Sequence, residues 1–409
     1  MKLLEVDTAQ QVKDKMNEHF RDITVGYEEV ELTSAMGRIA YEDILSELDV
    51  PDFNRSTVDG YAVVSKDTYG ASESMPVFLN ITGKVDMGRG TDLTVLPGSC
   101  AYVPTGGMIP QGADAMLMIE YTEQVDEGML AANSPVATGE NIILTGDDVR
   151  KGNRVLSKGR IIRSQDIGVL CAAGVSHVKV SKRPRVAVVS TGDEIVDPFG
   201  SVAPGQVRDI NTYTISAMVQ ELGGEVTESS IVKDDFELLR SKVDEASENN
   251  DIVVISGGSS VGIKDNTEKV IDSFGGPGVF VHGVAVKPGK PTILGRVRNA
   301  AVFGLPGHPV SAVIIFKLFV QELIDKLLGK TREDIYINAI CSVNLHSSPG
   351  KETHQLVELA EEADGYTAKP IHAKSSAISQ LSRAQGMIRI PISAEGIRKG
   401  ETVKVELFR

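Results

Sequence analysis

Residues 185–190 (RVAVVS), which lead into TGDEIV at 191–196, decide the fold of the middle of this chain. Such a continuous apolar run is typical of a strand that is buried on both faces of its sheet. Further elements follow at regular spacing: a helix after Asn211, helices over 235–249 and 265–274, and strands over 226–232, 252–256, 279–286, 292–297 and 301–303. This alternation predicts a doubly wound, mostly parallel α/β sheet within residues 181–329.

The sequence changes character on both sides of this region, so we predict a multidomain α/β plus β protein. Residues 51–139 contain short apolar runs broken by glycine and proline, which indicate a β-rich module. Residues 1–50 and 140–180 together are expected to form a discontinuous helical linker domain, with one helix over 8–23 and another over 164–173. Residues 330–409 return to alternating patterns typical of a small β-barrel.

Composition excludes several classes of function. The net charge of −14 argues against nucleic acid as a partner. Residues 310–328 are apolar but contain Lys317, Glu322 and Asp325, so we predict a core or dimer-interface helix rather than a membrane span. The three cysteines are scattered and the N-terminus lacks an apolar signal core, which indicates a cytoplasmic protein.

Polar, glycine-rich loops follow the predicted strands, and ligands of such sheets bind outside the carboxyl ends of the strands. Each loop alone fits simple turn chemistry. As a set, their amides, hydroxyls and lysines predict a cradle for phosphate or another oxyanion. The loops are STGDE at 190–194, SGGSSVG at 256–262, KPGKP at 287–291 and GLPGHP at 304–309, and the candidate ligand-binding residues are Thr191, Gly192, Ser256, Gly257, Gly258, Ser259, Gly262, Lys287, Lys290, Pro306 and Gly307.

Acidic residues gather near the same loops. They are Asp193, Glu194, Asp209, Asp234, Asp235 and Asp265. Beside a phosphate site, carboxylates commonly hold Mg²⁺. Asp235 and Asp265 also stand at the first positions of predicted helices, where capping is an equally good explanation. Asp193 and Glu194 precede no helix, so we favour a functional role for them.

Two polar loops stand out in the N-terminal half. One is NRSTVDGYA at 54–62, and the other is TGG at 105–107. Each is also compatible with an ordinary turn.

No GxSxG elbow is present, which argues against a serine hydrolase. Cys100 has no base near it in sequence, so we interpret it as a buried structural cysteine.

The order of the motifs resembles that of the molybdopterin molybdenumtransferases, a family that includes the E domain of gephyrin. The resemblance covers nearly the whole chain, although the α/β region alone also resembles the molybdopterin adenylyltransferases. It rests on PDFNRSTVDGYAV, PTGGMIPQGADAMLMIE, RVAVVSTGDEIV, SGGSSVGIKDNT, VKPGKPTILG and GLPGHPVSAVIIF.

The resemblance implies a homodimer of four-domain subunits that binds adenylylated molybdopterin and molybdate. Such an enzyme releases AMP with the help of Mg²⁺ and leaves molybdenum on the dithiolene, the final step of cofactor synthesis. It also implies a transient contact with the adenylyltransferase. By motif, Asp59 and Thr105 would come from the opposite subunit. The other implied roles are metal or phosphate binding by Glu194, Asp234 and Asp265, and contact of Lys287 and Lys290 with the anionic substrate.

Two segments depart from the family pattern. NIILTGDD at 141–148 keeps Asp148, a further metal candidate, but lacks the arginines of many members. Gly283, preceded by His282, stands where many members have a basic residue. Both changes remove cationic donors from the expected anion site. The alternatives are an adenylyltransferase, which would consume ATP, and a non-catalytic carrier or scaffold, which would be expected to lose the carboxylates.

Overall fold

The computed structural model describes residues 6–257, 266–331, 334–372 and 375–408. The chain forms two compact units. The first contains Met1–Glu28, Gly37–Tyr41 and Val180–Arg409, and the second contains Glu29–Met36 and Glu42–Lys179. The finer division into four domains stays a prediction.

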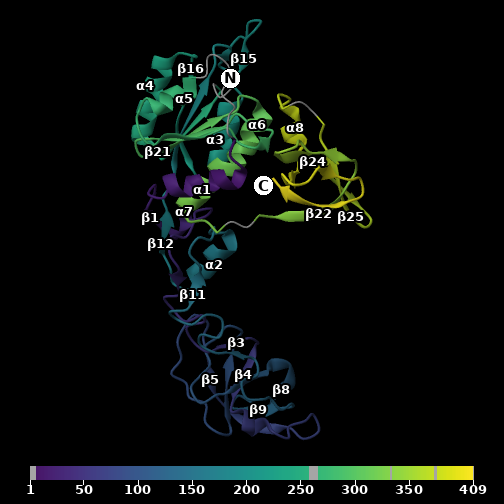
Figure 1. Ribbon diagram of the computed structural model, residues 1–409. Helices are drawn as coiled ribbons and strands as arrows, with labels where there is room; N and C mark the ends of the chain where they lie inside the picture. Colours follow the sequence, from purple (N-terminus) through teal and green to yellow (C-terminus); the bar gives the residue numbers. More distant parts are fainter. Residues whose placement is uncertain (1–5, 258–265, 332–333, 373–374, 409) are drawn as a thin grey trace. The chain divides into compact units, whose positions relative to one another are not determined.

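The first unit contains the predicted α/β sheet, whose six strands run in the order β16-β13-β17-β21-β20-β18 (Figure 1). The pairs among β16, β13, β17 and β21 are parallel, whereas β20 is antiparallel to both of its neighbours. The prediction of a mostly parallel sheet is therefore confirmed. The strands are β13 Arg185–Thr191, β16 Glu225–Val232, β17 Ile252–Ser256, β18 Gly278–His282, β20 Ile293–Val297 and β21 Ala300–Leu305.

The single strand predicted over 279–286 is wrong. β18 ends at His282, and Gly283 adopts a φ of 97°, which an extended strand does not allow. The chain then forms β19, Val286–Lys287, which pairs with β24, Glu352–Glu362, in a different sheet. The run at 279–286 therefore contributes strands to two different sheets.

Helices cover both faces of the α/β sheet, which explains why its central strands are apolar throughout. On one face, α4 (Phe236–Asn249) and α5 (Asn266–Asp272) share a buried cluster with β13 and β17. On the other face lie α3, Asn211–Glu221, and α6, Pro309–Ile315 (Figure 1). Asp235 caps α4, because its carboxylate accepts a hydrogen bond from the backbone N–H of Leu238 at 2.9 Å.

The apolar segment at 310–328 is a core helix with a π-helical turn. α6 continues through η4, Phe316–Val320, into α7, Gln321–Leu328, and ends at Gly329 with a φ of 63°. Ile314, Phe316 and Phe319 are fully buried. Within the described ranges, no helix has the length and apolar character needed to cross a membrane.

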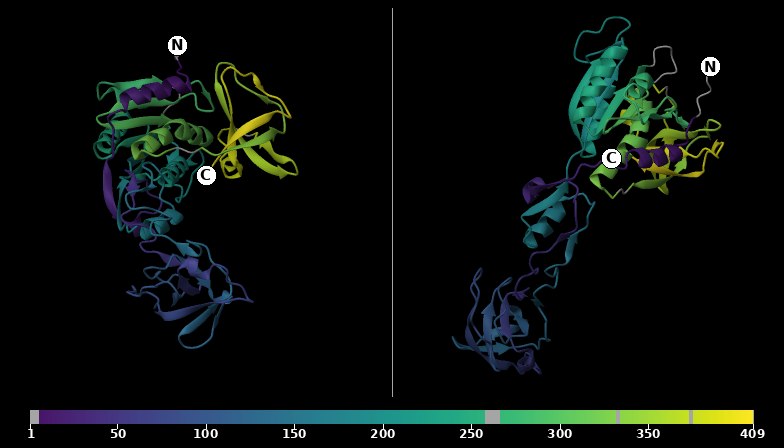
Figure 2. Two further views of the ribbon diagram at one scale, coloured as in Figure 1. Left: turned by 90° about the horizontal axis from the view of Figure 1, so that it is seen from below. Right: turned by 60° about the vertical axis from the view of Figure 1, so that its left-hand side comes forward.

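The C-terminal strands close into a small barrel, as predicted (Figure 2). The ring runs β24-β25-β22-β28-β26 and is closed by the pairing of β24 with β26. Its interior contains Ala339, Cys341, Val357 and Val405, all buried. The remaining ring strands are β22 Tyr336–Cys341, β25 Gly365–Pro370, β26 Gly386–Ile390 and β28 Thr402–Leu407.

The second unit is built on a six-stranded sheet in the order β7-β4-β6-β5-β9-β8. Buried residues lie on both faces: Val63, Leu79 and Cys100 belong to one cluster, and Ala101 and Met116 to the other. The predicted β-rich module is thus confirmed. The strands are β4 Gly60–Val63, β5 Val77–Lys84, β6 Ser99–Val103, β7 Ala115–Met118, β8 Thr122–Gln124 and β9 Met129–Ala132.

Shorter elements complete the two units. The two helices predicted outside the sheets are present: α1, which is capped by Thr8, and α2, which ends before Gly174 with a φ of 81°. The bounds are α1 Ala9–His19, α2 Ser164–Ala172, α8 Ser379–Arg383, β1 Tyr27–Glu31, β2 Ile44–Leu45, β3 Arg55–Ser56, β10 Ile142–Ile143, β11 Arg154–Leu156, β12 His177–Ser181, β14 Ile195–Val196, β15 Val207–Arg208, β23 Leu345–His346 and β27 Gly396–Ile397.

Candidate functional site

The carboxyl ends of the parallel strands bring three of the predicted loops to one edge of the sheet. Ser190 on β13 is paired with Ser256 on β17, and Ser256 is paired with Leu305 on β21. Gly257 has a φ of 100°, and a Cβ built on it would lie 2.2 Å from the Thr191 carbonyl oxygen. Only glycine therefore allows β13 and the loop after β17 to approach so closely.

Asn211, at the start of α3, joins two of these loops. Its buried amide donates to Ser256 Oγ at 2.8 Å and to the Gly307 carbonyl at 2.9 Å. A Cβ on Gly307 would lie 3.7 Å from Gly257 Cα, so the two glycine turns are in contact. Pro306, directly before Gly307 in its loop, is buried. This part of the predicted cradle is held together by one side chain that the sequence analysis did not single out.

Thr191, Asp193 and Asp234 form a second group at the same edge. Thr191 Oγ1 donates to Asp234 Oδ1 at 2.8 Å, and the Asp234 backbone N–H donates to Asp193 Oδ1 at 3.3 Å. Glu194 is exposed beside them, with its carboxylate over Gly192. The structure therefore brings together three predicted acidic residues and a threonine hydroxyl.

Asp209 has a structural role at this edge. It is 3 % exposed, and its carboxylate accepts hydrogen bonds from Ser190 Oγ at 2.9 Å and from the Thr212 backbone N–H at 3.1 Å. Those bonds fix the start of α3 against β13. The Asp209 carboxylate is thus buried in structural hydrogen bonds, whereas Asp193 and Glu194 are exposed.

The two lysines do not follow a strand of the α/β sheet, contrary to the prediction. Lys287 ends β19 on the barrel sheet, and its Nζ donates to Ser348 Oγ at 2.7 Å. Gly289 packs against Ile315 of α6, since a Cβ there would lie 2.4 Å from Ile315 Cδ1. Lys290 is exposed. The loop is thus positioned by the barrel and by α6, not by the sheet edge.

The second unit contains the remaining candidates. Asp59 and Thr105 lie together, because the Thr105 backbone N–H donates to Asp59 Oδ1 at 2.9 Å. Both side chains are exposed. The two loops also pair through Ser56, which accepts from the Gly106 N–H at 2.8 Å and donates to the Gly107 carbonyl at 3.0 Å.

Asp148 lies elsewhere in the second unit. It is exposed, and its backbone N–H donates to the Val50 carbonyl at 3.0 Å. Four predicted residues lie outside the described part of the chain: Gly258, Ser259, Gly262 and Asp265.

Comparison with known proteins gives a consistent result along the chain. Residues 4–174 match the MoeA N-terminal region (domain I and II), residues 187–326 match a probable molybdopterin binding domain, and residues 338–408 match the MoeA C-terminal region (domain IV). A putative molybdopterin biosynthesis protein of Methanocaldococcus jannaschii is 32% identical, with 100% of this chain and 98% of that protein covered. The chain belongs to the MoeA family.

Other relatives of this MoeA-family chain agree. A protein named molybdopterin molybdenumtransferase from Haemophilus influenzae is 31% identical over 98% of each chain. A solved structure of a molybdopterin biosynthesis MoeA protein from Pyrococcus horikoshii has a TM-score of 0.87 and 37% identity, covering 99% of this chain and 100% of that one. A second structure from the same organism gives a TM-score of 0.81 at 30% identity. The resemblance inferred from the motifs is confirmed.

Sequence reasoning on this MoeA-family chain missed Asn211 and Ser348. Asparagine at the start of a helix is ordinarily explained as a local cap. Here its side chain reaches two strand ends instead. The only available signal was its place at the start of a predicted helix. No sequence feature pointed to Ser348, because its contact with Lys287 depends on the pairing of β19 with β24.

Proposed function

We propose that this chain is a molybdopterin molybdenumtransferase. It would bind adenylylated molybdopterin and molybdate, release AMP in a Mg²⁺-dependent reaction, and leave molybdenum on the pterin dithiolene. The observation that carries the proposal is the full-length similarity to proteins that bear this name, such as that of H. influenzae. The strand-end cradle supports it, because both substrates are anions that need amide, hydroxyl and cationic donors.

The cradle residues would bind the phosphate groups. The hydroxyls of Thr191 and Ser256 and the turns at Gly192, Gly257 and Gly307 lie at one sheet edge, where backbone can approach an anion without a side chain in between. The buried Asn211 fixes two of these turns. Such a rigid arrangement lowers the cost of ordering the site when substrate binds.

Asp193, Asp234 and Glu194 are the residues that would hold Mg²⁺. The described part of the chain contains no group of three His, Cys, Asp or Glu side chains that could hold a metal. A pair such as Asp193 and Asp234 fits Mg²⁺ nonetheless, because this ion commonly takes one or two carboxylates together with substrate phosphates and water. When bound, Mg²⁺ neutralises phosphoryl oxygens. We also retain Asp148 and Asp265 as candidates.

Lys287 and Lys290 would contact the oxyanion. Lys287 already donates to Ser348 Oγ, so a hydroxyl and an ammonium group lie together on the barrel side of this loop. A tetrahedral dianion such as molybdate accepts hydrogen bonds from both kinds of donor. The roles of Gly258, Ser259, Gly262 and Pro306 in the cradle also stay proposals.

Asp59 and Thr105 would orient water or molybdate. Their shared hydrogen bond supports joint action.

We further propose that the chain works as a homodimer in which Asp59 and Thr105 contribute to the site of the opposite subunit. Light scattering at micromolar concentration should give twice the mass of the chain, and a monomeric mass would contradict this part of the proposal.

The free cysteines, one exposed at Cys171, support work in the reducing cytoplasm. A transient contact with the adenylyltransferase would then deliver the adenylylated pterin.

Two neighbouring aspartates offer a sharp test. Asp234 accepts the hydrogen bond from Thr191 at the cradle, whereas Asp235 caps α4. Asn caps helices as well as Asp does. Asp234→Asn should therefore reduce AMP release at least about tenfold, and Asp235→Asn should leave it near the wild-type rate. Equal rates for the two variants would show that Asp234 has no special role.

A further inference from the structure

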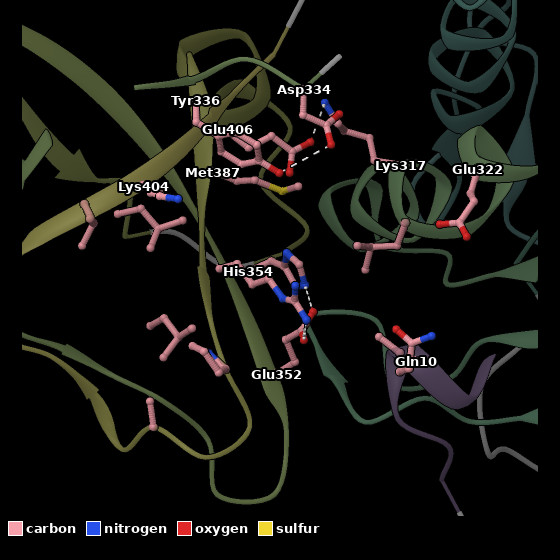
Figure 3. A pocket seen from close by; sticks show the side chains of 18 of the residues that line it. Gln10, Lys317, Glu322, Asp334, Tyr336, Glu352, His354, Met387, Lys404 and Glu406 are labelled. Atoms are coloured by element: carbon pink, nitrogen blue, oxygen red, sulfur yellow. Dashed lines mark hydrogen bonds and ion pairs between the residues drawn. The ribbon is translucent and has the colours of Figure 1, made fainter. Parts of the chain in front are cut away.

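A cavity of about 940 Å³ lies in the first unit, away from the residues assigned above (Figure 3). Its walls come from the start of α1, from η4 and α7, and from barrel strands β24, β26 and β28. None of the proposed molybdopterin-site residues lines it. This volume is within the range of pockets that bind small molecules.

Three basic side chains form a row on one wall. His354 on β24 is paired with Arg389 on β26, and the pairing of Ile388 with Val405 places Arg389 beside Lys404 on β28. All three basic residues line the cavity. Residues directly opposite one another on antiparallel strands have Cβ atoms roughly 5 Å apart, so the three can act on one ligand.

His354 has one ring nitrogen to spare. The residue is 4 % exposed, and its Nε2 lies 2.8 Å from Glu352 Oε1. Arg389 donates to the other oxygen of Glu352 at 2.6 Å. Within the described residues, His354 Nδ1 is buried with no hydrogen-bond partner. Buried polar atoms are nearly always hydrogen-bonded, so this nitrogen is a hydrogen-bonding group that the described residues leave unused.

Lys404 is also available. It is exposed, and it makes no hydrogen bond or ion pair among the residues that the structure describes. Three acidic side chains that line the cavity are paired with basic side chains that also line it. Glu322 pairs with Lys13, Asp325 with Lys330 at 3.3 Å, and Glu406 with Lys317 at 4.0 Å.

The opposite wall also favours an anion with an apolar body. Ala9 and Gln10, in the first turn of α1, line it, and the N-terminus of a helix attracts negative charge. Leu318 on η4 and Met387 on the barrel strand β26 supply apolar surface. We propose that this cavity binds a small organic anion, with its phosphate or carboxylate group at the row formed by His354, Arg389 and Lys404.

Calorimetric titration of the full chain tests the proposal with phenyl phosphate, benzoate and the neutral benzyl alcohol. Phenyl phosphate or benzoate should bind and benzyl alcohol should not. Lys404→Met should weaken binding about tenfold, because a charge-assisted hydrogen bond is lost. Lys369→Met is the matched control, since Lys369 is exposed on barrel strand β25 outside the cavity. The Lys369→Met variant should bind the anions with the same affinity as the wild type.

A third variant separates this site from the proposed catalytic one. Lys287→Met should retain the part of the binding heat that Lys404→Met removes, because Lys287 does not line the cavity. Loss of the heat in Lys287→Met but not in Lys404→Met would place the anion at the other site and overturn the proposal. Absence of heat with both anions would also overturn it. As a second readout, the Nδ1 signal of His354, assigned with His354→Gln, should shift in NMR spectra when phenyl phosphate is added.

Discussion

Gly257→Ala tests the close approach on which the cradle depends. Gly257 has a φ of 100°, which costs an alanine about 1–3 kcal/mol. The new Cβ would lie 2.2 Å from the carbonyl oxygen of Thr191, far inside normal contact. This neighbour is backbone on a buried central strand, so it cannot rotate away, and overpacking of this kind costs a further 1–3 kcal/mol or so. We expect a total loss of about 4 kcal/mol.

Gly307→Ala is the matched control for this substitution. Its Cβ would lie 3.7 Å from Gly257 Cα, an ordinary contact, and its backbone is not in the positive-φ region. The expected loss is below about 1 kcal/mol. Urea unfolding followed by far-ultraviolet circular dichroism measures both variants against the wild type. Losses within about 1 kcal/mol of each other would refute the reasoning, because the glycine at 257 would then not be required by geometry.

Three other predictions follow from the same structure. Asn211→Ala removes two buried hydrogen bonds and should lower the free energy of unfolding by about 2 kcal/mol in urea, whereas Asn249→Ala at an exposed helix end should change it by less than about 0.5 kcal/mol. Burial alone would raise the pKa of Glu352, but its hydrogen-bonded partners lower the pKa to about 2. Glu352→Gln should therefore cost about 2 kcal/mol at pH 7, and the difference from the wild type should shrink as the pH falls from about 4.5 toward 2; a difference independent of pH would contradict this. Burial raises the pKa of Cys100 to about 12, so at pH 8 a disulfide reagent should modify the exposed Cys171 rapidly and Cys100 only after unfolding, and fast modification of Cys100 in the folded protein would contradict its burial.

Much of the α/β fold could be predicted because its signals are local. The apolar run at 185–190 marks a strand with helices on both sides, and parallel strands bring their carboxyl ends to one edge. That reasoning correctly placed Thr191, Ser256 and Gly307 together. It also left two explanations open for Asp235, and the structure shows that this residue caps α4.

The rest depends on contacts between distant parts of the chain. The run at 279–286 is apolar apart from His282 and Gly283, and nothing in it shows that Val286 pairs with a barrel strand. The two lysines after it were consequently assigned to the wrong sheet. The pairing of His354 with Arg389 likewise arises from barrel closure, so no sequence motif marks the cavity beside it.

The most direct test of the proposed function is one reaction with the purified protein, adenylylated molybdopterin, Mg²⁺ and molybdate. AMP release and activation of a cofactor-free molybdoenzyme would be followed together, with and without molybdate. We predict molybdate-dependent release of AMP and recovery of the enzyme's activity. Tight binding of the adenylylated pterin without AMP release under either condition would contradict the assignment and indicate a carrier.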